Sequence, residues 1–186
     1  MANALGFVDD VLRFWFRELT PRDWWEKHPA VDFAIARRFA PLHDRLSREA
    51  SPSLFVTADQ QLAAVIVLDQ LSRHLYRGDR RSFTQDSLAL SIAEAAVSGG
   101  FDRQLGPSRR RFLYLPYEHS ERRDVQAHSV ALFATLGSGH ADSLEYALQH
   151  KMIIDRFGRF PHRNKVLGRA TTPEETVFLQ QPGSSF

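Results

Sequence analysis

Three short stretches of the sequence carry side chains that could bind an anion or transfer protons. Their polar residues are Asp69, Gln70, Arg73, Glu118, His119, Glu121, Arg156, Arg159, His162, Arg163 and Asn164. A planar guanidinium binds a carboxylate or phosphate through two parallel hydrogen bonds. Paired carboxyl groups beside a histidine can act as general acid and base. The residue types therefore predict either a pocket for a small anion or an acid–base site.

Asp69 and Arg73 lie four residues apart, within an apolar stripe of a helix that is predicted to follow Thr57. The opposite side of that helix is also apolar, so we expect it to be buried on two faces. Residues four apart on a helix can touch, and buried charges must be paired. The pair is thus either structural or the floor of a pocket. We expect the pocket, with Arg73 open to an anion among other arginines, so that Arg73→Ala costs little stability.

Glu118 and Glu121 are three residues apart, so one helical turn would bring them to one side, with His119 between them. They could serve as acid and base, or they could pair with arginines. The third stretch, residues 155–164, holds three arginines and Pro161, where the start of a helix would attract anions. Its alternative is a basic surface turn.

The elements that must position these residues are helical throughout. Apolar residues follow helical spacing, and no alternating run predicts a sheet, so we expect an all-α fold. We expect one domain over residues 1–180 and a loose tail over residues 181–186. The predicted limits of the helices are the capping residues Thr20, Thr57 and Thr172 and the glycines Gly78, Gly99, Gly137 and Gly158.

Several single residues carry further expectations. Pro41 should kink or split a helix that begins at Pro29, and Pro116 should interrupt one that begins at Pro107. His74 is expected on a solvated face. Trp24 and Trp25 are expected to be core anchors rather than a stacking platform.

Composition excludes several classes of protein. The chain has 186 residues, 43% hydrophobic and 25% charged, as expected for a globular domain. It has no cysteine, which excludes disulfides and thiolate metal sites, and no His/Glu spacing supports zinc, so we expect no metal and no cofactor. No leader and no apolar run of ~20 residues is visible, so we expect a cytoplasmic protein away from membranes. The net charge is only +2, and no nucleic-acid motif is found, so nucleic acid is not favoured.

Three strings together resemble the bacterial domain-of-unknown-function family 924. They are residues 67–73, 115–121 and 156–164, supported by 11–16, and the resemblance extends from Phe7 to Leu179. Leu71 departs from the family pattern, where phenylalanine is expected. The resemblance implies antiparallel helix pairs stacked in a right-handed, tetratricopeptide-repeat-like α-α superhelix. It implies no activity and no catalytic residue.

Three hypotheses follow for the function. The first is a pocket, lined by arginine, glutamate and histidine, that binds a small anion carrying a carboxylate or a phosphate. The second is a structural ion network with a role in protein–protein interaction, and a protein partner or a homo-oligomer stays open. The third is a hydrolase-like enzyme that uses Glu118, Glu121 and His119 as acid and base. A solvent-reachable cavity would favour the first and third over the second.

Overall fold

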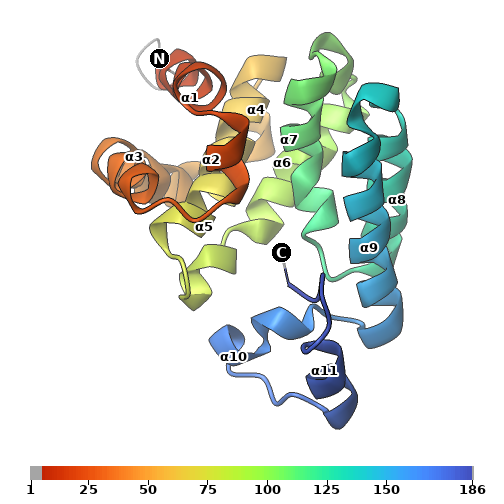
Figure 1. The fold of residues 1–186 in the computed structure, drawn as a ribbon. Helices are drawn as coiled ribbons and strands as arrows, with labels where there is room; N and C mark the ends of the chain where they lie inside the picture. Colours follow the sequence, from red (N-terminus) through yellow and green to blue (C-terminus); the bar gives the residue numbers. More distant parts are fainter. Residues whose placement is uncertain (1–5, 186) are drawn as a thin grey trace.

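A computed structural model describes residues 6–185, and every regular element in that range is helical (Figure 1). The prediction of an all-α fold is therefore confirmed. The α-helices are α1 (Val8–Arg13), α2 (Pro21–Trp25), α3 (Pro29–Glu49), α4 (Ala58–Val65), α5 (Ser72–Leu75), α6 (Asp86–Ser98), α7 (Pro107–Glu118), α8 (Arg123–Ala134), α9 (Ala141–Phe157), α10 (Asn164–Leu167) and α11 (Pro173–Phe178). None of these helices is long and apolar enough to span a bilayer.

The ends of the helices follow local chemistry. Capping boxes at Thr20, Thr57 and Thr172 begin α2, α4 and α11, as predicted. Each box satisfies backbone N–H groups that the first turn of a helix leaves without a partner. Helix α9 ends at Gly158, whose φ of +69° lies in the left-handed region that favours glycine.

A continuous helical rod runs through the middle of the molecule and carries the first polar stretch. It consists of α4, a π-helical segment (Ile66–Leu71) and α5. Residues 61–72 are all buried, which confirms a helix enclosed on more than one side. It packs against α3, α6 and α7, so its polar side chains can reach only its neighbours or an internal cavity.

Two prolines lie inside helices without ending them. Helix α3 is continuous through Pro41, and α7 is continuous through Pro116, so a split at Pro41 and an interruption at Pro116 are both wrong, whereas a kink at Pro41 stays a prediction. A proline inside a helix removes one backbone hydrogen bond. In α7 that loss occurs where residues 112–118 are all buried, and packing maintains the helix.

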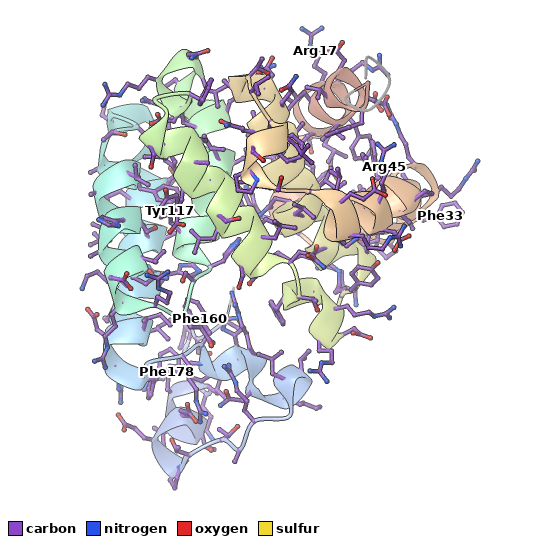
Figure 2. All side chains as sticks on the ribbon, turned by 180° about the vertical axis from the view of Figure 1, so that it is seen from behind. Arg17, Phe33, Arg45, Tyr117, Phe160 and Phe178 are labelled. Carbon is purple, nitrogen blue, oxygen red and sulfur yellow. The ribbon has the colours of Figure 1, made fainter. Side chains whose placement is uncertain are left out.

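Helices α6, α7, α8 and α9 each pack against the next in the chain, and α10 and α11 lie beyond the end of α9 (Figure 1). A small apolar cluster of Ile153, Ile154, Phe160 and Phe178 joins α11 to α9 (Figure 2). The sequence predicts a loose tail after residue 180. In the structure Ser184 is buried, and its Oγ donates to the carbonyl of Leu179 at 3.2 Å. The right-handed superhelix and the division into one domain and a tail stay predictions.

Candidate functional site

A cavity of about 720 Å³, here called the arginine cavity, lies between α2, the helical rod, α7, α9 and the turn at residues 161–163. All three polar stretches contribute to its wall. The predicted site residues that line it are Gln70, Arg73, Glu118, His119, His162 and Arg163. The stretches that lie far apart in the sequence therefore converge.

Asp69 lies behind the cavity wall and contacts three of the residues that line it. It is 0% exposed and lies in the π-helical segment, a form of helix that is common at functional sites. His119 Nδ1 is 2.8 Å and Arg73 Nη1 is 3.2 Å from its Oδ1, and Gln70 Nε2 donates to its Oδ2 at 2.6 Å. Burial raises the pKa of Asp69, but the charge of Arg73 and the hydrogen bonds from His119 and Gln70 outweigh it and hold the pKa well below its usual range. Asp69 is therefore ionised.

Arg73 and Arg163 share a second carboxylate, that of Asp86. Arg73 Nη1 donates to one oxygen at 3.1 Å, and Arg163 Nη1 donates to the other at 3.2 Å. The Arg163 guanidinium also lies 4.6 Å from the ring centres of Phe83 and Phe160. Burial lowers the pKa of Arg163 to about 10, so it remains a cation at neutral pH. Arg73 is thus held by two carboxylates, and the expectation that it stands open among arginines is wrong.

Glu118 and His150 form a buried pair that also lines the cavity. Glu118 Oε1 lies 3.4 Å from His150 Nδ1, which donates to the carbonyl of Tyr146 at 2.8 Å. Burial raises the pKa of Glu118 to about 8 and lowers the pKa of His150 to about 3. Burial also lowers the pKa of His162 to about 4. All three side chains are therefore neutral at pH 7.

Besides Asp69, four predicted site residues lie outside the cavity lining: Glu121, Arg156, Arg159 and Asn164. Two of them meet on one carboxylate of α11. Arg159 Nε donates to Glu175 Oε1 at 2.6 Å, and Asn164 Nδ2 donates to Glu175 Oε2 at 3.1 Å. Arg156 pairs with Glu174 at 2.9 Å. These contacts fasten α11 to the end of α9.

Glu121 makes a similar structural contact. Its Oε2 accepts from Arg169 at 2.7 Å, and its Oε1 accepts from the backbone N–H of Phe160 at 2.8 Å. Burial raises the pKa of Glu121, but the hydrogen bonds from these two donors lower it by more, so the pKa lies below its usual value. Glu121 thus supports the turn that presents Arg163.

Several lining residues were not predicted from the sequence: Trp24, Trp25, His74, Arg77, Arg111, Asp142 and Tyr146. His74 is buried and its Nδ1 lies 2.8 Å from Asp32 Oδ1, so the expected solvated position is wrong. Trp24 Nε1 donates to the carbonyl of Trp15 at 2.9 Å, as an anchor would, whereas Trp25 is 49% exposed. Arg111 lies 4.6 Å from the Trp25 ring. Helical spacing could have found Arg111, since it lies four and seven residues before Leu115 and Glu118.

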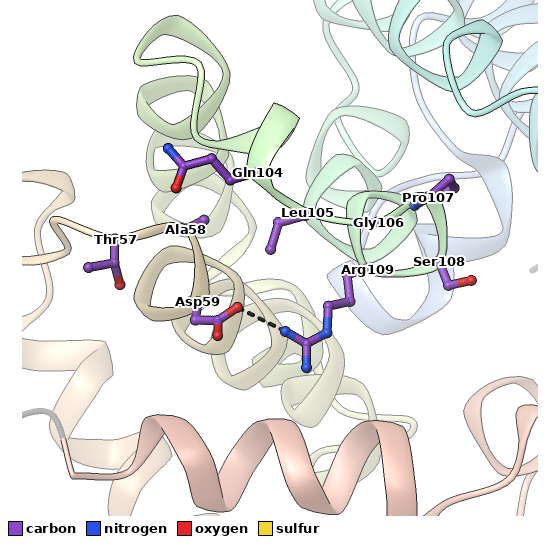
Figure 3. Close-up of a pocket in the computed structure, with 9 residues that line it drawn as sticks. All are labelled: Thr57, Ala58, Asp59, Gln104, Leu105, Gly106, Pro107, Ser108 and Arg109. Atoms are coloured by element: carbon purple, nitrogen blue, oxygen red, sulfur yellow. Dashed lines mark hydrogen bonds and ion pairs between the residues drawn. The ribbon is translucent and has the colours of Figure 1, made fainter.

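A second hollow, the α4–α7 cleft, has a volume of about 810 Å³ (Figure 3). Residues 57–59 and 104–109 line it, and an ion pair joins Asp59 and Arg109 at 2.9 Å. None of the three predicted stretches reaches it. Within residues 6–185, no group of three or more metal-ligating side chains is close enough to hold a metal ion.

Comparison with known proteins places the chain in a family. Residues 11–183 match the family described as bacterial protein of unknown function, DUF924. The solved structure of a protein of unknown function from Agrobacterium tumefaciens is similar, with 35% sequence identity and a TM-score of 0.87, over 93% of this chain and 96% of that one. Among curated proteins no significant match is found. The chain belongs to the DUF924 family.

Proposed function

We propose that the protein binds a small anion, bearing a carboxylate or a phosphate group, in the arginine cavity. One observation carries the proposal: Arg73 and Arg163 line the cavity and share the carboxylate of Asp86, and Arg73 also contacts Asp69. Two guanidinium groups carry more N–H donors than these contacts use, which leaves donor capacity for a further anion.

The balance of charge on the wall supports the same conclusion. Four arginines line the cavity: Arg73, Arg77, Arg111 and Arg163. Among residues 6–185, three carboxyl groups line it, those of Glu26, Glu118 and Asp142, and that of Glu118 is protonated at pH 7. An anion inside a partly desolvated cavity interacts more strongly with such a wall than it would in water.

The volume and the lining also suit a ligand. About 720 Å³ lies within the range of small-molecule sites, roughly 300–1,000 Å³. Trp25 and Tyr146 add apolar surface to the lining. We therefore expect a compact organic anion as the ligand. We also propose that the protein is cytoplasmic and works without cysteine chemistry.

Each of the other two hypotheses is supported by some of the predicted site residues. The structural network is supported for Glu121, Arg156, Arg159 and Asn164, whose contacts hold α11. An acid–base role keeps Glu118 and His119 but has no support from Glu121, which is paired with Arg169 away from the cavity wall.

The test is binding of inorganic phosphate, acetate and succinate, measured by calorimetry and by thermal unfolding. A ligand at a hundredfold excess over its Kd stabilises the fold by about 2.7 kcal/mol. We expect Arg111→Gln to weaken binding about 10-fold or more, as for loss of a charged hydrogen bond. Arg111 suits this test because its only ion pair with another described residue, Asp142, is long at 3.7 Å, so the variant should fold.

Arg109→Gln is the matched control. Arg109 lies on the same helix but faces the α4–α7 cleft, so its loss should leave the Kd unchanged. The proposal is wrong if none of the three anions raises the unfolding temperature of the wild type at millimolar concentration. It is also wrong if Arg111→Gln and Arg109→Gln bind equally well.

A further inference from the structure

His119 presents one ring nitrogen to Asp69 and the other toward the arginine cavity. Its Nδ1 lies 2.8 Å from Asp69 Oδ1, its side chain is 14% exposed, and the residue lines the cavity. Within residues 6–185, Nε2 makes no hydrogen bond. The imidazole is thus fixed at one end and available at the other.

The Asp69 contact determines which nitrogen carries the proton. An ionised carboxylate only accepts hydrogen bonds, so Nδ1 must donate, and in a neutral imidazole Nε2 is then an acceptor. Asp69 is held in this form by Arg73 and Gln70 as well as by His119. Burial and the nearby charge of Arg73 lower the pKa of His119, which keeps the ring neutral.

An acceptor on this wall is unexpected for a site that takes an anion. Anionic oxygens are acceptors too, and two acceptors cannot bond without a proton between them. The cations Arg73 and Arg163 can bind the charged group, but Nε2 of His119 needs a donor. A ligand that satisfies both must carry an O–H or N–H beside its anionic group.

We propose that the cavity selects hydroxy acids: small anions whose carboxylate or phosphate binds Arg73 and Arg163 while a hydroxyl donates to Nε2 of His119. The inference rests on the proposed anion site. Arg73 and His119 contact the same oxygen of Asp69, so the two recognition points face one part of the cavity. The hydroxyl and the charged group are therefore expected to lie near each other in the ligand.

The experiment compares ligands that differ by one hydroxyl. The Kd values of malate and succinate, and of glycolate and acetate, are measured by calorimetry at neutral pH. We expect the wild type to bind the hydroxylated member of at least one pair about 3- to 10-fold more tightly, the gain from one net hydrogen bond.

His119→Asn is the informative variant. The amide nitrogen of asparagine can replace Nδ1 as donor to Asp69, but nothing replaces Nε2, so the fold should be retained and the acceptor lost. We expect His119→Asn to bind malate and succinate equally, with the affinity for succinate unchanged. His128→Asn, at an exposed position of α8, is the control and should keep the wild-type preference.

The outcomes are distinguishable. If succinate binds but malate binds no better, the hydroxyl inference is wrong and the anion site stands. If malate is preferred equally by wild type and His119→Asn, His119 is not the acceptor and the inference is wrong. If none of the four acids binds, the inference and the proposed anion site both fail.

Discussion

Replacing Glu118 with glutamine should make the protein more stable at alkaline pH. Glu118 is 5% exposed, and its pKa is raised by burial from 4.5 to about 8. Between these two values the folded chain keeps a proton that the unfolded chain releases, so the wild type loses stability as the pH rises. At 1.36 kcal/mol per pKa unit, the total loss is at most roughly 5 kcal/mol. Glutamine does not titrate, so the variant should not share this loss.

Urea unfolding at several values between pH ~5 and pH ~8 measures the effect. We expect the difference in unfolding free energy between Glu118→Gln and wild type to grow by a few kcal/mol across this range. His150, whose folded pKa is about 3, also contributes to the pH dependence below pH ~6.5, where stability falls as its unfolded form becomes protonated. That contribution is present in both proteins and largely cancels in the difference.

Glu145→Gln, at an exposed position of α9, serves as the control and should leave the pH profile of the wild type unchanged. Parallel profiles for wild type and Glu118→Gln would refute the reasoning. They would mean that the Glu118 carboxyl is already ionised at neutral pH, held by a protonated His150 as an ion pair.

Three further substitutions test the contacts around the site by urea unfolding. Arg73→Ala strands two carboxylates and should cost about 3–5 kcal/mol, whereas Arg77→Ala, at an exposed ion pair, should cost less than about 1 kcal/mol; equal costs would contradict the buried pairing. Arg159→Ala should destabilise the fold near pH 7 and lose its effect in acid, because Arg159 lowers the pKa of Glu175 to about 2 and that stabilisation disappears as the pH falls from about 4.5 toward 2; an effect independent of pH would contradict this. Gly158→Ala should cost about 1 kcal/mol, because an L side chain is strained at φ +69°, and no loss would count against that strain.

Local signals predicted the helix ends and the class of fold. The capping boxes at Thr57 and Thr172 and the left-handed glycine at Gly158 each involve residues within one turn of each other, so the sequence contains the whole interaction. The convergence of the polar stretches could also be anticipated, because Asp69 and Arg73 interrupt an apolar stripe and need partners.

Interactions with distant partners could not be predicted in this way. Glu121 and His119 are two residues apart, yet one binds Arg169 and the other binds Asp69. Nothing in the local pattern separates these two outcomes, since both residues follow the end of α7. Pro116 shows the same limit: local preference predicts a break, and burial of the surrounding helix prevents it.

The π-helical segment Ile66–Leu71 determines how a change in the number of residues in the rod would affect the site. A π-helical turn contains one residue more than the α-helical turn it replaces, so deleting a single residue here would restore a regular α-helix. The residues that follow would keep their places around the helix axis, because the π-helical turn is what absorbs the extra residue. Arg73 would therefore stay at the wall of the arginine cavity, and only side chains of the turn itself, such as Asp69 and Gln70, would change direction. A one-residue deletion in this segment should therefore preserve helix content and the position of Arg73 but remove the Asp69 contacts on which His119 depends.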